Sequence, residues 1–280
     1  MRRNKGKGMP SSKDQHSAAF AHKEALQLGA SSREGNILRF PFFAEPQPAA
    51  EDPGLGDLVL QRARHRGGFL WKRAVDVSAA MSALAAFSVM LPFIALAIKL
   101  DSRGPVFYLQ TRIGMNRRRP RSGGTGRSDR RKVVQPGRPF RIYKLRTMRT
   151  DAELAGPQWA AKRDPRVTRV GRFLRLTRLD EVPQFMNVLR GEMSLIGPRP
   201  ERLCFIHKLE KEIPNYRDRL LVLPGITGLA QVVNGYDDST ESVRRKIELD
   251  RQYIRSQGVW TDVRIILHTV RVVVTGEGAN

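Results

Sequence analysis

The chain has 280 residues and a formal net charge of +23, with 50 Lys and Arg against 27 Asp and Glu. Apolar residues make up 40% of it, which is too many for a wholly disordered protein, and the length suffices for a hydrophobic core. The single cysteine, Cys204, excludes an intrachain disulfide framework and a zinc site built from cysteines. The positive charge indicates a polyanionic partner: nucleic acid, an anionic membrane surface or a phosphorylated substrate.

The charge is distributed unevenly along the chain. Residues 1–66 are predicted to form a disordered tail, because Gly, Ser, Pro and Ala with scattered charges dominate them. More than half of the excess positive charge lies between Arg112 and Arg149, where 14 Lys and Arg accompany one acid, Asp129. Within that stretch, residues 116–139 are rich in Gly, Ser and Arg and are predicted to form a flexible, basic, solvent-exposed insertion.

The longest apolar segment contains 22 residues without a charge, from Val77 to Ile98. At about 1.5 Å per residue, a helix of this length can cross about 30 Å of hydrocarbon. Pro92 argues against a plain span, because it removes the hydrogen bond to the carbonyl of Ser88 and clashes with that turn. The pattern alone leaves open a straight transmembrane helix, a buried core helix, and a broken helix that enters and leaves the membrane on one face. In each case residues 67–100 form a basic flank followed by this helix.

Two strands are predicted after the apolar helix. Val106–Ile113 and Pro139–Met148 are rich in strand-forming residues, and we expect them to pair across the insertion as a long-looped hairpin. Helical periodicity follows from Asp151 to about Tyr216. The predicted fold class is therefore α+β and predominantly helical, with one folded domain over residues 101–280.

The chain is predicted to end in two amphipathic helices, Ser242–Ser256 and Val259–Thr275. In the second helix, apolar residues recur near helical spacing, with Arg264 and Arg271 between them. Amphipathicity alone leaves open whether this helix lies in a membrane interface or packs on the core.

Adjacent carboxylates, Asp180 and Glu181, stand at the start of an apolar-periodic helix. One interpretation is structural: Thr177 caps a helix and Asp180 lies in its first turn. The surrounding cations favour chemistry instead, because arginine binds phosphate with two hydrogen bonds and keeps a nearby carboxylate ionised at neutral pH. Such a carboxylate can attack phosphorus, while a second one holds a divalent cation or acts as a base. The cations are Arg166, Arg169, Arg172, Arg175 and Arg178, followed by Arg199 in Gly197–Pro200.

Eight short motifs follow one another in a fixed order between Phe69 and Val274. They are Lys72–Asp76, Pro92 in the apolar run, Gly104–Gly114, Phe140–Met148, Asp164–Gly171, Leu179–Gln184, Met193–Glu201 and Pro224–Gln231. One of these motifs alone would be weak, but together and in this order they are specific. By them the chain resembles the bacterial sugar transferases, which are monotopic polyprenyl-phosphate phosphoglycosyl transferases.

The resemblance implies a reaction in which a sugar-1-phosphate moves from a UDP-sugar to undecaprenyl phosphate and UMP is released. Such a reaction initiates the assembly of exopolysaccharide, capsule, O-antigen or glycoprotein glycans. Asp180 matches the family nucleophile, which carries a phospho-sugar intermediate, and Glu181 matches the neighbouring glutamate linked to an essential Mg²⁺. Lys144 and Arg146 fall on a basic motif near the active site. Arg175 and Arg199 fall on phosphate-binding arginines.

The resemblance also implies a location and partners. The apolar helix re-enters, with a break at Ser88 and Pro92, so that both of its ends and the catalytic domain lie on the cytosolic face of the bacterial inner membrane. Anionic lipid and downstream glycan-assembly enzymes are the further partners, and nucleic acid is not one. The alternative is a membrane-tethered nucleic-acid-binding protein or a non-catalytic scaffold, although residues 116–139 lack aromatic side chains suited to base stacking. The sequence does not identify the sugar.

Overall fold

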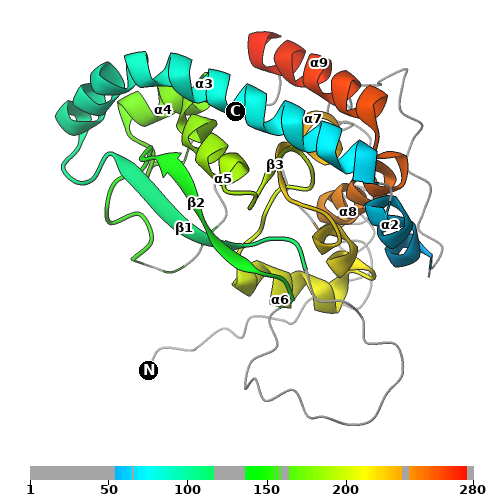
Figure 1. Cartoon of the computed structure of the whole chain (residues 1–280). Coiled ribbons are helices and arrows are strands. Elements are labelled where there is room, and N and C mark those ends of the chain that lie inside the picture. Colours follow the sequence, from blue (N-terminus) through cyan, green and yellow to red (C-terminus); the bar gives the residue numbers. More distant parts are fainter. Residues whose placement is uncertain are drawn as a thin grey trace, which may run out of the picture. The chain divides into compact units, whose positions relative to one another are not determined.

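A computed structural model describes residues 54–64, 66–116, 136–154, 156, 158, 164–234 and 240–275. Within these ranges the chain is mainly helical, with two small β-sheets (Figure 1). The predicted tail up to residue 53 and residues 117–135 of the predicted insertion lie outside the described residues. The helices are α2 (Leu55–Arg64), α3 (Arg66–Asp101), α4 (Arg169–Leu176), η1 (Leu179–Gln184), α5 (Phe185–Leu189), α6 (Leu203–Glu212), η2 (Tyr216–Leu220), α7 (Leu229–Val233), α8 (Thr240–Ser256) and α9 (Val259–Thr275).

The predicted hairpin is confirmed. Strands β1 (Phe107–Ile113) and β2 (Pro139–Leu145) pair antiparallel, with Tyr108 opposite Lys144. Alternate side chains of β2 are buried, and Phe140 and Ile142 join Ala80 of α3 and Val188 of α5 in one hydrophobic cluster. The sheet therefore lies against α3 and α5, and Lys144, two residues beyond Ile142, reaches Glu181 of η1.

A second, parallel pair of strands is formed by two short segments, the first of which was predicted to be helical. Strands β3 (Ser194–Ile196) and β4 (Gly225–Thr227) have three residues each, too few for periodicity to reveal them. Gly225 is required here, because a Cβ atom on it would lie 2.1 Å from the backbone nitrogen of Gly197. This close approach fixes the start of the loop Gly197–Pro200.

Helix α2 corrects the predicted extent of the tail. The tail was expected to reach residue 66, but Leu55–Arg64 is helical and Leu55 is 2% exposed. Its apolar residues are too few to stabilise an isolated helix, and it packs against α3 and α8 instead. Tertiary contact, which a local pattern does not reveal, accounts for the difference.

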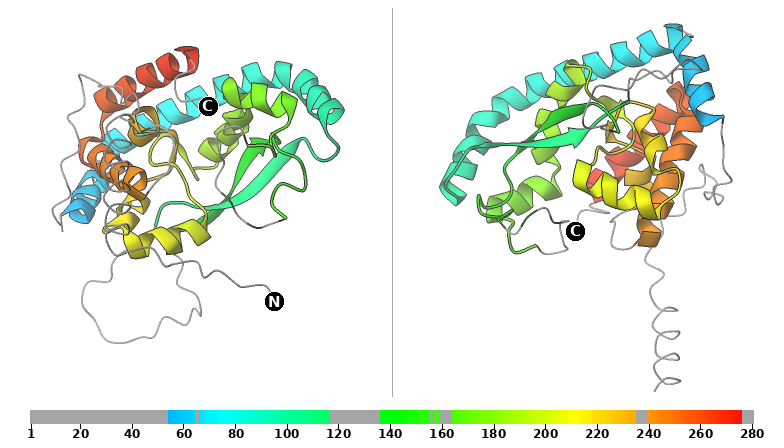
Figure 2. Two further views of the ribbon diagram at one scale, coloured as in Figure 1. Left: turned by 180° about the vertical axis from the view of Figure 1, so that it is seen from behind. Right: turned by 90° about the horizontal axis from the view of Figure 1, so that it is seen from below.

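Helix α3 contains the apolar run and is the one helix in the described residues that is long and apolar enough to cross a membrane, over Leu70–Asp101. It continues through Pro92, and its ribbon bends towards its C-terminal end (Figures 1 and 2). The hydroxyl of Ser88 donates to the carbonyl of Ala85 at 2.7 Å. Many of its large apolar side chains are exposed, including Val89 and Phe93, which are 72% and 73% exposed. A soluble core helix would bury these groups, so the buried-helix interpretation is wrong.

Polar groups tie both ends of α3 to the rest of the fold. Near its N-terminal end, Arg73 donates to the carbonyls of Val188 and Leu189, and Asp76 accepts from the backbone of Leu195 at 3.0 Å. At its C-terminal end, Asp101 accepts from the backbone of Val170 at 2.9 Å. Both ends of this apolar helix are therefore held by the same folded unit.

Helix α9 has the predicted bounds and lies beside α3 in both views (Figures 1 and 2). Lys72 of α3 pairs with Asp262 of α9 at 2.6 Å, and Thr269 hydrogen-bonds Thr227 of β4 at 2.8 Å. One side of α9 thus packs on the core. The other side exposes apolar residues: Val259, Trp260, Val263, Ile266, Leu267, Val270 and Val273.

Candidate functional site

The adjacent carboxylates lie in η1, a 3₁₀ turn between α4 and α5. Thr168 caps the start of α4 by accepting from the backbone of Gly171, and α4 ends at Thr177, whose hydroxyl donates to the carbonyl of Phe173. Thr177 is therefore the C-cap of α4, and the prediction that it caps the helix of Asp180 is wrong. Asp180 and Glu181 are 6% and 9% exposed, so two neighbouring acids are buried together.

Glu181 is held by two cations that come from different parts of the chain. Its Oε1 accepts from Lys144 Nζ of β2 at 2.9 Å and from Arg199 Nη2 at 2.6 Å. Arg199 Nη1 also lies 3.5 Å from Glu181 Oε2. Strand β2, the turn η1 and the loop after β3 thus converge on one carboxylate, as a site for a charged substrate requires.

Burial and charge drive the pKa values of the two acids apart. Burial acts to raise the pKa of Glu181, but Arg199 and Lys144 overcome it and hold that pKa well below its usual range. Burial and then the charge of Glu181 raise the pKa of Asp180 to about 6, against the opposing effect of Lys144, Arg175 and Arg199. Asp180 is therefore mainly ionised at neutral pH, as expected, yet it is more basic than an ordinary aspartate. Because Asp180 has a raised pKa and Glu181 a lowered one, the pair suits a nucleophile, Asp180, beside a carboxylate that stays ionised, Glu181.

The predicted arginine cluster is only partly assembled. The charge of Arg175 acts on Asp180, and its Nε donates to the hydroxyl of Thr147 at 2.9 Å. Arg166 instead forms a two-pronged pair with Asp164, with Nη2 to Oδ2 at 2.6 Å. The run of arginines is thus divided between the site and the scaffold.

Arg146 is the predicted site residue that the structure places elsewhere. Its guanidinium donates to the carbonyls of Ile98, Ser102 and Arg103. It therefore satisfies carbonyls at the C-terminal end of α3, while Lys144, two residues earlier, reaches Glu181. Arg146 thus supports the fold at this position, and its role in binding phosphate stays a prediction.

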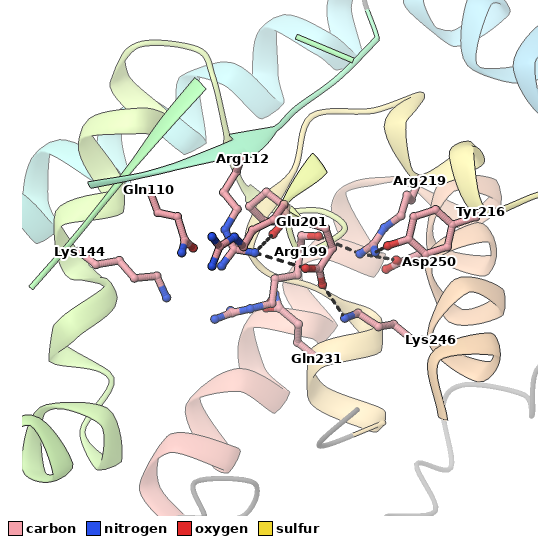
Figure 3. A network of polar contacts seen from close by, with 12 residues as sticks. Gln110, Arg112, Lys144, Arg199, Glu201, Tyr216, Arg219, Gln231, Lys246 and Asp250 are labelled. Atoms are coloured by element: carbon pink, nitrogen blue, oxygen red, sulfur yellow. Dashed lines mark hydrogen bonds and ion pairs between the residues drawn. The ribbon is translucent and has the colours of Figure 1, made fainter. Parts of the chain in front are cut away.

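Gln231 at the end of the motif Pro224–Gln231 belongs to the site, although it was not among the predicted site residues. Its Oε1 accepts from Arg199 Nη1 at 3.3 Å, and its Nε2 donates to the carbonyl of Ile226 at 3.1 Å. Figure 3 shows Gln231 beside Arg199, opposite Lys144. The place of Gln231 in a recognised motif was the available signal of a functional role. The sequence could not show that Gln231 contacts Arg199.

The acids at this site fit Mg²⁺ only together with a substrate. No group of three His, Cys, Asp or Glu able to hold a metal occurs in the part of the chain that the structure describes. Glu181 Oε1 already accepts two hydrogen bonds, whereas Oε2 faces one nitrogen at 3.5 Å and keeps a lone pair. Mg²⁺ is commonly held by one or two carboxylates plus substrate phosphates, so Glu181 and the adjacent Asp180 match that mode of binding.

Comparison with known proteins agrees with this geometry. The sequence model of the family described as bacterial sugar transferase matches residues 68–276. A UDP-N-acetylgalactosamine-undecaprenyl-phosphate N-acetylgalactosaminephosphotransferase from Aeromonas hydrophila is 45% identical over 208 residues, which are 74% of this chain and 44% of that protein.

Two further relatives are named UDP-glucose:undecaprenyl-phosphate glucose-1-phosphate transferase. The one from Caulobacter vibrioides is 42% identical over 75% of this chain and 72% of its own length. The one from Escherichia coli is 41% identical over 72% of this chain and 39% of its own length. The chain thus spans less than half the length of two of these three relatives.

Proposed function

Because the chain belongs to the bacterial sugar transferase family, we propose that it transfers a sugar-1-phosphate from a UDP-sugar to undecaprenyl phosphate and releases UMP. The observation that carries the proposal is the buried pair Asp180 and Glu181, with Lys144 and Arg199 on Glu181. The relatives named above act on UDP-N-acetylgalactosamine or UDP-glucose, so an undecaprenyl-phosphate hexose transfer is the expected class. Such a product begins the assembly of a polysaccharide or another surface glycan.

Asp180 acts as the nucleophile in the first half of the reaction. Its carboxylate oxygen forms a bond to the phosphorus that bears the sugar, and the bond from that phosphorus to the UMP oxygen breaks. UMP leaves with the electron pair, and an acyl phosphate that carries the sugar remains on Asp180. In the second half, an oxygen of undecaprenyl phosphate attacks the same phosphorus and the Asp180 carboxylate is released.

The cations around the pair stabilise the charge that develops on phosphate. Lys144 and Arg199 lie at Glu181, and Arg175 lies close enough to act on Asp180. Fixed cations in a buried site stabilise an anionic transition state more strongly than they do in water. Glu181 would hold Mg²⁺ together with the substrate diphosphate, and the ion would supply further neutralisation of the leaving UMP.

We further propose that α3 is a monotopic anchor whose two ends lie on the cytosolic face of the inner membrane. Its exposed apolar residues suit hydrocarbon, and Arg73, Asp76 and Asp101 tie both ends to the catalytic unit. A straight span would place one end across about 30 Å of hydrocarbon from the other, out of reach of that unit. The bend near the C-terminal end and Pro92 support a re-entrant path.

The function is tested by UMP release from a panel of UDP-sugars. Purified protein in detergent should turn over repeatedly and release UMP from at least one of UDP-glucose, UDP-galactose or an N-acetylated UDP-sugar only when polyprenyl phosphate and Mg²⁺ are both present. Without the lipid, UMP release should stop at one equivalent per chain, because Asp180 then stays loaded. Repeated turnover without the lipid, or no UMP release with any sugar, would contradict the proposed reaction. Retention of an oligonucleotide by the same preparation would favour the nucleic-acid-binding alternative.

A further inference from the structure

The loop that carries Arg199 is held by its backbone. Pro198 and Pro200 flank Arg199 and fix their own φ angles near −65°. Each of the three carbonyls accepts a hydrogen bond: Pro198 from the backbone of Gly225 at 3.0 Å, Arg199 from Arg219 at 2.8 Å, and Pro200 from Arg112 at 3.2 Å. Water satisfies the carbonyls of an ordinary surface loop. Here protein groups donate to all three carbonyls, so the position of this loop is fixed by the fold.

The contacts of the buried Arg219 side chain fix its orientation. Its side chain is 2% exposed; Nη2 lies 3.0 Å from Asp250 Oδ2 and 2.8 Å from the Arg199 carbonyl, and Nη1 donates to the hydroxyl of Tyr216 at 3.1 Å. Figure 3 shows Arg219, Tyr216 and Asp250 together, to the right of Arg199. Because a guanidinium is planar and its N–H directions are fixed, these partners determine where the Arg199 carbonyl lies.

Helix α8 supplies two of the charged side chains that hold Arg219 and the loop of Arg199. Asp250, which pairs with Arg219, and Lys246, which donates to Glu201 at 3.1 Å, lie one turn apart on the same face of α8. Glu201 in turn pairs with Arg112 at 3.3 Å, and Arg112 holds the Pro200 carbonyl. A buried ion pair and a partly buried chain of ion pairs thus connect α8 to the two carbonyls at and after Arg199.

We propose that Arg219, neutralised and oriented by Asp250, is a positioning residue that aims the Arg199 guanidinium at Glu181. It does not touch the reacting groups; it acts through the backbone of Arg199. A buried ion pair is weak evidence for stability by itself, because desolvation offsets most of the attraction, so precise placement of a neighbour is the better account of why this one is present. The inference rests on the proposed transferase function.

The test is a double-mutant cycle that couples Arg219→Lys to Arg199→Gln. Lysine keeps the charge of Arg219 but cannot donate to Tyr216 and the loop carbonyl in one fixed plane while it pairs with Asp250. In the wild-type background Arg219→Lys should lower kcat by about 10- to 100-fold, as expected for a misplaced catalytic group. In the Arg199→Gln background the same change should lower kcat by less than about twofold, because the guanidinium that it aims is gone.

Asp218→Asn is the matched control. Asp218 pairs with the buried Arg251 at 2.9 Å and so joins the same two elements, η2 and α8, one residue before Arg219. It should lower the melting temperature and leave kcat within about twofold in both backgrounds. Arg219→Lys should also move the acid limb of the pH profile to higher pH, because Arg199 lowers the pKa of Asp180, whereas Asp218→Asn should not.

Two outcomes are decisive, and a second variant is available if the first does not fold. Equal losses of kcat from Arg219→Lys in both backgrounds would show a general structural role and overturn the positioning role. If Arg219→Lys does not fold, Tyr216→Phe, which removes one hydrogen bond to Arg219, takes its place in the cycle with the same criterion. Absence of UMP release from the wild-type protein would overturn the proposed function, which distinguishes that failure from a failure of the positioning role.

Discussion

Two regions of this protein reverse the usual distribution of polar and apolar groups. At η1 two acids are buried and the cations that face them are partly buried, whereas α3 and α9 expose Phe93, Trp260 and other large apolar side chains. A folded protein normally does the opposite, because burying charge and exposing apolar area both cost free energy. The first region suits a nucleotide diphosphate and the second suits a lipid. The difference fits the proposed reaction, in which a water-soluble donor and a membrane acceptor meet.

The largest expected effect comes from removing the proposed nucleophile of the buried charged region. Asp180→Asn keeps the volume of the side chain and removes the attacking carboxylate, so turnover should fall by at least about 1,000-fold. UMP release with polyprenyl phosphate measures it. Residual turnover within about tenfold of wild type, in protein that is shown to be folded, would contradict the assignment.

The same variant should be more stable than the wild type, which separates loss of chemistry from loss of fold. The pKa of Asp180 is raised to about 6 in the folded state, so the ionised form is disfavoured there, and that destabilisation is complete above pH 6. The melting temperature of Asp180→Asn should therefore exceed that of the wild type at pH 7, and the difference should disappear as the pH falls towards 4. A lower melting temperature at pH 7 would contradict this account of the buried acid.

The second largest effect removes a cation from the site. Arg199→Gln takes away the 2.6 Å contact with Glu181 and one of the charges that act on Asp180, so turnover should fall by about 100-fold. Arg202→Gln is the control, because Arg202 forms a pair with the partly exposed Glu153 and such pairs contribute little. If Arg202→Gln lost as much activity as Arg199→Gln, the effect would come from the local charge and not from the contact with Glu181.

A smaller effect concerns the pH dependence of turnover. The acid limb of kcat/KM should have an apparent pKa near 6, where free Asp180 gains its proton. Lys144 lowers the pKa of Asp180, so Lys144→Gln should shift this limb to higher pH in addition to lowering the rate. A limb that stays in place in Lys144→Gln would show that another group controls the profile.

The last prediction concerns the topology of the exposed apolar helix α3 and involves no change in turnover. If both ends of α3 lie on the cytosolic face, single cysteines placed near Lys72 and near Lys99 in a Cys204→Ser background should be equally protected from an impermeant reagent in intact cells. Both should be labelled after the membrane is permeabilised, which is the control for accessibility. Labelling of only one of them in intact cells would establish a straight span.

The sequence predicted those parts of the fold that a local pattern or a motif determines. The hairpin of β1 and β2 and the bounds of α9 follow from strand-forming residues and periodicity, and Lys144 and Arg199, expected at the site from their motifs, contact Glu181. Strands β3 and β4 were not predicted, because three residues carry no period.

Tertiary contacts account for the remaining differences at the site. Lys144 and Arg146 would share a face of a continuous strand, but β2 ends at Leu145, so only Lys144 reaches Glu181 and Arg146 turns to the end of α3. Arg219 and Asp250 lie 31 residues apart in the printed sequence, and no local signal connects them. The residues proposed to bind substrate thus follow motifs, whereas the residue proposed to position one of them becomes visible only in the fold.

The most direct test of the central claim, that Asp180 carries the sugar phosphate, is to trap the intermediate. Protein is incubated with Mg²⁺ and a UDP-sugar labelled in the sugar, without polyprenyl phosphate, and is quenched rapidly before intact mass and bound label are measured. The account predicts one sugar phosphate on the wild-type chain, its loss when polyprenyl phosphate is added before the quench, and none on Asp180→Asn. A wild-type chain that stays unmodified, or an Asp180→Asn chain that still acquires the label, would contradict it.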